Sequence, residues 1–163
     1  MLTQSTQPER GSDISQATAR RTGTVVPSNY YLYAEDDPDD QFFMKEMMAA
    51  HHPEIGLVVC DNGFELFQYL EALRPGDHYP CMIILDLNMP VWDGHRTLRE
   101  LRNKPFLNEL TVVMFSTSSA KPEAAHAIEL GADAFITKPV KFEDFAAVIN
   151  TFTELCKPAL KKG

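Results

Sequence analysis

The sequence has little cysteine, no C-x-x-C pair and no long apolar run. Its three cysteines, Cys60, Cys81 and Cys156, lie far apart along the 163 residues. An odd, sparse set of this kind is typical of a reducing compartment, and it indicates neither a disulfide framework nor a zinc site. We therefore expect the cysteines to be small buried apolar residues in a cytoplasmic protein.

Other absences exclude further classes of protein. The longest apolar runs are about five residues, whereas a membrane-spanning helix needs roughly 20. The N-terminus lacks the apolar stretch of a secretion signal, so nothing in it indicates export. Positive charge is scarce, because 15 lysine and arginine residues face 23 aspartate and glutamate residues, a net charge of −8. That balance argues against a general binder of nucleic acids or anionic membranes.

What is present indicates one folded domain between two tails. Residues 1–28 are rich in Ser, Thr, Gln and Arg without hydrophobic periodicity, so we predict a disordered N-terminal tail. Residues 29–157 carry the apolar patterns and are enough for one hydrophobic core. Residues 158–163 are predicted to be a short C-terminal tail that contains lysine.

Short apolar segments alternate with amphipathic segments along the predicted domain. The apolar segments are bounded by turn residues and predict buried strands at residues 30–34, 55–60, 81–85, 111–115 and 134–137. A helix is predicted after each strand. The first helix has Asp39 as its cap, and the last buries Phe142, Phe145, Ile149, Phe152 and Cys156. The alternation predicts a three-layer, doubly wound α/β fold with a parallel sheet.

Polar side chains follow four of these strands at the point where each one ends. Glu35 and Asp36 follow the first strand, and the later ones end at Asp86, Ser116 and Lys138. One such residue alone is usually a helix cap, a turn former or a solvated charge. The carboxyl ends of parallel strands meet at one edge, where ligands bind in open α/β sheets. We therefore expect all five side chains to share a crevice.

This set of side chains suits the transfer of a phosphoryl group. Crowded carboxylates repel one another, and their pKa values rise unless a cation offsets them. Mg²⁺ prefers hard oxygen ligands and also engages phosphate, while Lys138 adds a fixed positive charge and Ser116 a hydroxyl donor. With Asp86 as the nucleophile, these are the parts needed to place a phosphoryl group on a carboxylate.

Several short motifs occur together: Glu35-Asp36-Asp37, Leu85-Asp86-Leu87-Asn88-Met89-Pro90 with Asp93-Gly94, Ser116-Thr117, Gly131-Ala132-Asp133-Ala134-Phe135, and Lys138-Pro139. Asp86 precedes Ser116 by 30 residues, and Ser116 precedes Lys138 by 22. In these motifs the sequence closely resembles the receiver domain of two-component response regulators, from Asn29 to about Leu155. Pro38-Asp39-Asp40 and the connection with Pro105-Phe106-Leu107 also resemble the stand-alone regulators paired with phytochrome-type kinases.

The resemblance implies a fold and a metal site. The fold is the flavodoxin-like, CheY-like one, with a five-stranded parallel sheet in the order 2-1-3-4-5 and five helices. Asp86 is the implied phosphoacceptor, and Mg²⁺ is the implied cofactor. The metal would be bound directly by Asp36 and Asp86, by the backbone carbonyl of Asn88 and, through water, by Glu35.

The resemblance also implies roles for residues at the last two strands. Ser116 and Lys138 would bind the phosphoryl oxygens. A cis Lys138–Pro139 bond would place the ammonium in the crevice, and such a bond is rare enough to be functional when present. Phe135 occupies the position of the family's switch aromatic residue, which responds to Ser116.

The implied function is that of a single-domain response regulator in a phosphorelay. It would accept a phosphoryl group from a sensor histidine kinase or a histidine phosphotransfer protein. It would assist its own phosphorylation and dephosphorylation without being an enzyme. The output surface would comprise the helix after Pro122, the strand 134–137 and the last helix, where a second copy of the chain is a candidate partner. Because the chain ends within about 20 residues of Phe142, we expect a protein contact as output, with no nucleic acid and no membrane bound.

Three residues depart from the common pattern of the family without removing its chemistry. Glu35 stands where Asp is common, and it keeps the charge with a longer reach. Ser116 replaces a frequent Thr and keeps the hydroxyl. Val140 stands where Phe is common after Lys-Pro, which affects only packing.

Two other classes of protein use a similar sheet. A haloacid-dehalogenase-type phosphatase also has an aspartate nucleophile and Mg²⁺, but it needs a second acid two residues later, where this chain has Asn88. A flavodoxin-like cofactor carrier needs a phosphate-binding loop rich in Gly, Ser or Thr after the first strand, where this chain has residues Glu35 to Pro38. Flavin absorbance of the purified protein would favour the second class.

Overall fold

A parallel sheet of five strands lies at the centre of the computed structural model, which describes residues 28–163. The strands are Tyr30–Ala34 (β1), Gly56–Cys60 (β2), Met82–Leu85 (β3), Val112–Ser116 (β4) and Ala134–Thr137 (β5). The described helices are Pro38–His51 (α2), Gly63–Glu71 (α3), Gly94–Arg102 (α4), Lys121–Glu129 (α5) and Phe145–Leu155 (α6). Two 3₁₀ turns, Leu107–Glu109 and Phe142–Asp144, precede β4 and α6. The strand order β2-β1-β3-β4-β5 confirms the predicted fold.

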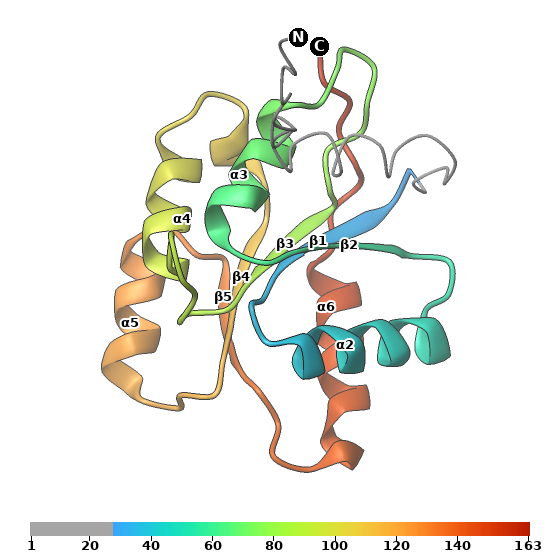
Figure 1. Ribbon diagram of the computed structural model, residues 1–163, viewed down its shortest axis with the longest axis vertical. Helices are drawn as coiled ribbons and strands as arrows, with labels where there is room; N and C mark the ends of the chain where they lie inside the picture. The colour runs from blue at the N-terminus through green and yellow to red at the C-terminus, as the bar shows by residue number, and fades with distance from the viewer. Residues whose placement is uncertain (1–27) are drawn as a thin grey trace, which may run out of the picture.

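Helices cover both faces of the sheet (Figure 1), because the central strands are apolar on both sides. α3, α4 and α5 lie on one face, and α2 and α6 lie on the other. Leu66 and Leu98 belong to the first of the two resulting apolar clusters, and Met44 and Phe152 belong to the second. Each such side chain stabilises the fold by about 1.5–3 kcal/mol when fully buried. Among the helices of residues 28–163, none is long and apolar enough to cross a membrane.

Helix α2 begins at the carboxyl edge of the sheet, and its first residue is Pro38. Proline suits the first helical position, because the N–H that it lacks would have no partner there. Asp37 therefore becomes the cap, and its carboxylate accepts the backbone N–H of Asp39 at 2.8 Å. The prediction of Asp39 as the cap is wrong by two residues. Asp39 instead lies in the first turn, where an acidic side chain interacts favourably with the helix dipole.

Helix α6 packs on the sheet through most of its predicted apolar stripe. Phe145, Ile149 and Phe152 are buried, as the spacing of the apolar residues predicts. Phe142 is 68% exposed, so its predicted burial is wrong. The reason is local, because Phe142 lies in the 3₁₀ turn before the helix, where the helical periodicity does not apply.

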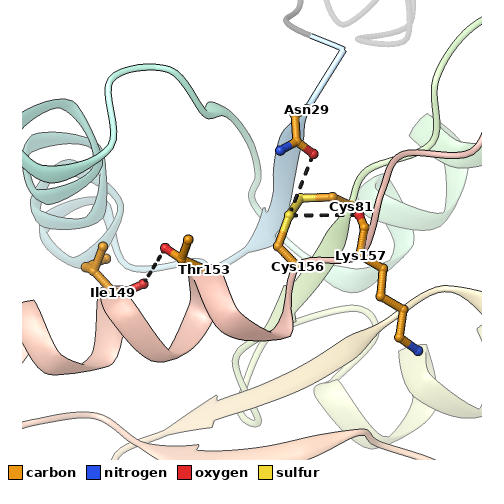
Figure 2. The surroundings of a disulfide bond; sticks show 6 residues. All are labelled: Asn29, Cys81, Ile149, Thr153, Cys156 and Lys157. Atoms are coloured by element: carbon orange, nitrogen blue, oxygen red, sulfur yellow. Dashed lines mark hydrogen bonds between the residues drawn. A yellow bond between two sulfur atoms is a disulfide. The ribbon is translucent and has the colours of Figure 1, made fainter.

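Cys81 and Cys156 form a disulfide bond, with their Cα atoms 5.1 Å apart (Figure 2). Cys81 precedes β3 and Cys156 follows α6, so the bond joins the sheet to the last helix at the amino edge of the sheet. The prediction that no cysteine is paired is wrong for these two, because 75 residues of sequence conceal their proximity. Cys60 is the free, buried cysteine among the described residues. The argument from cysteine content for a reducing compartment therefore loses its support.

The last residues lie against the loop that precedes β3 rather than extending as a tail. The backbone N–H of Tyr79 donates to the carbonyl of Leu160 at 2.7 Å, and that of Lys162 donates to the carbonyl of Asp77 at 2.8 Å. These bonds hold the end of the chain beside the segment that leads to Cys81. The predicted N-terminal tail, residues 1–28, lies outside the described residues apart from its last residue.

The Cys156→Ser variant should have a free energy of unfolding about 4 kcal/mol below that of the oxidised wild type, on the loop-closure model of disulfide stabilisation. The physical reason is the long loop that the bond closes, since its two cysteines are 75 residues apart. Urea unfolding with and without a thiol reductant measures the change. The reductant should destabilise the wild type and leave Cys156→Ser unaffected. An equal effect on both proteins would contradict the role of this bond.

Candidate functional site

Three carboxylates meet at the carboxyl edge of the sheet, which the strand order places at one crevice. The N–H of Glu35, which follows β1, donates to the carbonyl of Cys60 at 3.0 Å. The N–H of Asp86, which follows β3, donates to the carbonyl of Ala34 at 3.1 Å. These bonds extend the sheet one residue beyond the strands and fix the backbone from which both side chains start. Glu35, Asp36 and Asp86 each bring a carboxylate oxygen to within 4.8 Å of the others.

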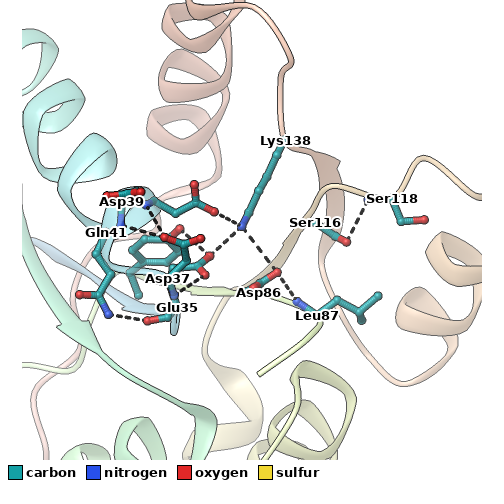
Figure 3. A network of polar contacts seen from close by, with 11 residues as sticks. Glu35, Asp37, Asp39, Gln41, Asp86, Leu87, Ser116, Ser118 and Lys138 are labelled. Atoms are coloured by element: carbon teal, nitrogen blue, oxygen red, sulfur yellow. Dashed lines mark hydrogen bonds and ion pairs between the residues drawn. The ribbon is translucent and has the colours of Figure 1, made fainter. Parts of the chain in front are cut away.

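The ammonium of Lys138 lies among these carboxylates (Figure 3). Its Nζ is 2.7 Å from Glu35 Oε2, 2.9 Å from Asp40 Oδ2 and 3.6 Å from Asp86 Oδ1. The backbone N–H of Lys138 donates to the carbonyl of Ser116 at 2.6 Å, which ties the end of β5 to β4. Burial disfavours the charged ammonium, but the hydrogen bonds with Glu35 and Asp40 outweigh it and raise the pKa of Lys138. The side chain of Lys138 therefore stays positively charged.

The Lys138–Pro139 peptide bond is trans, as are all peptide bonds described in residues 28–163. The expected cis bond is therefore wrong for this structure. A bond before proline prefers the trans form by about 0.5–1 kcal/mol. Lys138 reaches the acidic side chains from the trans backbone, so the cis form is not needed to place its ammonium there.

The carboxyl group of Asp86 is poorly hydrated, since the residue is 8% exposed. Burial raises its pKa to about 6, against the opposing charge of Lys138, and the charge of Glu35 adds to the rise. The N–H of Leu87 donates to Asp86 Oδ1 at 2.8 Å and stabilises the ionised form. Near neutral pH the group is therefore a carboxylate, and it is more basic than an exposed aspartate, as suits a nucleophile.

Two side chains of the site were not among the predicted residues. Asp40, in the first turn of α2, pairs with Lys138. Tyr33 of β1 donates its hydroxyl to Glu35 Oε2 at 3.1 Å. Burial and the charge of Glu35 raise the pKa of Tyr33, so its hydroxyl stays protonated. A signal was available for Tyr33, because residues two apart on a strand point to the same face.

The other predicted residues lie around this cluster. The Ser116 hydroxyl oxygen accepts the N–H of Ser118 at 3.2 Å at the end of β4 (Figure 3). Asn88 is exposed two residues after Asp86. Phe135 is half-buried on β5 and packs against the apolar cluster under α3 and α4. The structure thus gathers Glu35, Asp36, Asp86 and Lys138, and it joins Ser116 to Lys138 through their backbones.

The carboxylate trio fits a divalent cation. Three oxygen ligands within 4.8 Å of one another are hard donors of the kind that Mg²⁺ prefers, and Mg²⁺ keeps several waters when few protein ligands are present. Asp36 is exposed on the open side, where a hydrated ion has access. Asp40 adds a fourth negative charge beside Lys138, so the carboxylates outnumber the ammonium and attract a further cation.

Comparison with known proteins identifies similar chains. Residues 32–150 match the family model described as the response regulator receiver domain. Response regulator Rcp1 of Synechocystis sp. is 25% identical over 126 residues, which span 76% of this chain and 86% of Rcp1. In other curated relatives the match covers between 16% and 61% of their length.

Solved structures have the same fold. The response regulator RPA3017, from red light signalling in R. palustris, has a TM-score of 0.72 and 25% identity, covering 82% of this chain and 99% of that one. The phosphorylated cyanobacterial phytochrome response regulator RcpA has a TM-score of 0.66 and 26% identity, covering 78% and 92%. The Mn²⁺-bound form of Rcp1 has a TM-score of 0.66 and 22% identity, covering 82% and 99%, a likeness of fold alone.

Asp86 should make the protein less stable as the pH rises from about 4 to about 6. An unfolded aspartate has a pKa near 3.9, whereas the pKa of Asp86 in the folded protein is about 6. In that window the unfolded chain loses its proton first, so rising pH favours unfolding. The Asp86→Asn variant lacks this penalty. It should be more stable than the wild type above about pH 6, by roughly 1–3 kcal/mol for a shift of this size.

Urea unfolding of both proteins between about pH 4 and pH 8 measures this difference. The stability of Asp86→Asn relative to the wild type should grow up to the folded-state pKa and then stay level. Carboxylates outside the cluster contribute equally to both proteins, so the comparison isolates Asp86 together with its interactions with Glu35 and Lys138. A difference that is independent of pH would show that burial does not raise this pKa.

Proposed function

This chain belongs to the response regulator receiver domain family, and from that premise we propose that it carries a phosphoryl group on Asp86. The donor would be a phosphohistidine of a sensor histidine kinase or of a histidine phosphotransfer protein. The observation that carries the proposal is the buried Asp86 carboxylate, set between two acidic neighbours and the Lys138 ammonium. We propose a phytochrome-type kinase as the donor, which the likeness to RPA3017 and RcpA supports.

In the proposed step, a carboxylate oxygen of Asp86 attacks the phosphorus of the phosphohistidine. The new O–P bond forms as the N–P bond breaks, and the electron pair of the N–P bond returns to the imidazole nitrogen. Lys138 would stabilise the charge on the transferred oxygens, since its Nζ is already 3.6 Å from Asp86 Oδ1. The Ser116 hydroxyl would turn from Ser118 to donate to the same oxygens.

The proposal includes Mg²⁺ bound by Asp36, Asp86 and the backbone carbonyl of Asn88, with Glu35 acting through water. When bound, a divalent cation neutralises charge on the phosphoryl oxygens. The different roles of the two neighbouring acids follow from their surroundings. Asp36 is exposed and available for direct contact, whereas Glu35 is 1% exposed and already accepts hydrogen bonds from Tyr33 and Lys138.

Apolar side chains beside Lys138 support a protein as the partner that delivers the phosphoryl group. Val140 and Phe142, between β5 and α6, are 101% and 68% exposed. Together with Phe43 and Lys138 they help to line a hollow of about 340 Å³. A partner that covers these side chains would bury apolar surface and exclude water next to Lys138. We include a cytoplasmic location in the proposal. We propose no binding to nucleic acid or to a membrane.

The proposed output is a change in the surface formed by α5, β5 and α6. Phosphorylation places a group that carries close to two negative charges beside Ser116 and Lys138, where a carboxylate carried one. Movement of Ser116 toward them would vacate space behind it, and the half-buried Phe135 would rotate inward to fill that space. A second copy of this chain or another protein would then bind the altered surface.

Beryllofluoride or acetyl phosphate, supplied with Mg²⁺, should react with the wild type and not with Asp86→Asn, because the amide is not a nucleophile toward phosphorus. Intact mass spectrometry measures one added phosphoryl group, and NMR measures the beryllofluoride complex. Omission of Mg²⁺ should abolish both. Asp61→Asn is a matched control that should react normally, because Asp61 follows β2 at the same edge but is not one of the three clustered carboxylates. An acyl phosphate on Asp86→Asn would contradict the assignment.

Phe135→Ala should uncouple the output surface from phosphorylation, because alanine cannot fill the space that Ser116 vacates. NMR shifts on α5 and α6, with and without beryllofluoride, measure the coupling, and they should be much smaller in the variant than in the wild type. Ile136→Ala is the matched control, since Ile136 is the next residue of β5 and packs against the opposite apolar cluster. Wild-type shifts in Phe135→Ala would rule out the switch role of Phe135.

A further inference from the structure

Tyr33 brings a phenol to the acidic edge from within β1. The side chain is 1% exposed, and its hydroxyl donates to Glu35 Oε2 at 3.1 Å. An apolar side chain would fill this position of a buried strand without the cost of burying a hydroxyl. Tyr33 takes no part in the proposed phosphoryl transfer. That function therefore does not explain the hydrogen bond from Tyr33 to Glu35.

The two oxygens of the Glu35 carboxylate have different partners (Figure 3). Oε2 accepts from Lys138 Nζ at 2.7 Å and from the Tyr33 hydroxyl at 3.1 Å. Oε1 accepts the backbone N–H of Asp37 at 3.1 Å. A carboxylate oxygen has about two lone-pair sites, so Oε2 is saturated, whereas Oε1 keeps a site for a cation or its water. The hydroxyl of Tyr33 thus helps to determine which oxygen faces the cation.

We propose that Tyr33 is a positioning residue that holds Glu35 when Lys138 moves from Glu35 to the phosphoryl group. This inference rests on the proposed function, in which Lys138 binds the transferred oxygens, and it adds that Lys138 gives up its bond to Glu35 to do so. Glu35 is 1% exposed, so water has little access to replace the departing ammonium. The Tyr33 hydroxyl then remains as a donor to Oε2. A buried carboxylate oxygen left without a donor is costly, and Tyr33 removes that cost.

The hydroxyl should matter more in the activated state than in the resting state. In the resting state the charge of Glu35 is compensated by Lys138, which also pairs with Asp40 at 2.9 Å. Once Lys138 has moved, Oε2 no longer shares its charge with the ammonium, so the charge-assisted hydrogen bond from the Tyr33 hydroxyl becomes stronger. A contact that is stronger in one state shifts the equilibrium toward that state. Tyr33 therefore favours the activated state.

Tyr33→Phe tests this role, because it removes the hydroxyl and keeps the ring. Beryllofluoride is titrated into the full chain at saturating Mg²⁺, with fluorescence of the single tryptophan, Trp92, or NMR as the readout. The apparent Kd for beryllofluoride should rise roughly fivefold, because the hydrogen bond exists in both states and only its gain in strength on activation changes the Kd. Tyr31→Phe is the matched control and should bind as the wild type does. Tyr31 is 0% exposed in the same strand, but its ring packs against Phe152.

Urea unfolding of the unliganded variants separates positioning from packing. A purely structural role predicts a lower free energy of unfolding for Tyr33→Phe with an unchanged Kd. An equal rise of the Kd in Tyr31→Phe and Tyr33→Phe would likewise overturn the proposal. The failure of the proposed function has a different signature, because the wild type itself would then fail to bind beryllofluoride with Mg²⁺. If the wild type binds and Tyr33→Phe matches it, only the role of Tyr33 is wrong.

Discussion

The acidic edge of this receiver domain depends on the ammonium of Lys138. Glu35 is almost completely buried, and an ionised carboxylate in such a place costs several kcal/mol unless a positive charge and hydrogen bonds compensate it. Lys138 provides that charge at 2.7 Å and also pairs with Asp40 of α2. Its own backbone N–H donates to the carbonyl of Ser116, which fixes the point from which the side chain starts. One side chain from the end of the sheet thus stabilises carboxylates that come from β1, β3 and the first described helix.

The sheet explains why a long side chain is needed for this role. β1 and β3 are neighbours, so Glu35 and Asp86 lie side by side at the ends of adjacent strands. β5 lies two strands beyond β3, a distance of roughly 10 Å at the usual spacing between strands. A short side chain at position 138 could not cover that distance. The flexible stem of a lysine can, and it also allows the ammonium to change partners without moving the strand.

Much of this arrangement could be predicted from the sequence, because a parallel sheet brings every strand's carboxyl end to one edge. The carboxylate trio and Lys138 follow from that rule alone. The rule does not predict that side chains from within a strand, such as Tyr33, or from a helix, such as Asp40, also lie at this site. It also says nothing of pairs at the opposite edge, and so the bond between Cys81 and Cys156 was missed. Each of these depends on packing in three dimensions that strand topology does not determine.

The balance of charge indicates the order in which the site must fill. With Asp86 ionised, four carboxylates surround one ammonium, so an approaching phosphoryl donor meets a net negative charge near −3. In the proposed function a divalent cation reduces that charge to near −1, which weakens the repulsion of an approaching anion and gives its oxygens a positive charge to contact. The acyl phosphate adds about one further negative charge, because a group near −2 replaces a carboxylate. In the proposed function that addition would draw Lys138 away from Glu35 and leave the buried carboxylate to Tyr33 and the hydrated cation. We therefore expect the cation to bind before the phosphoryl group is transferred, and the partners of Glu35 to determine how readily the lysine moves.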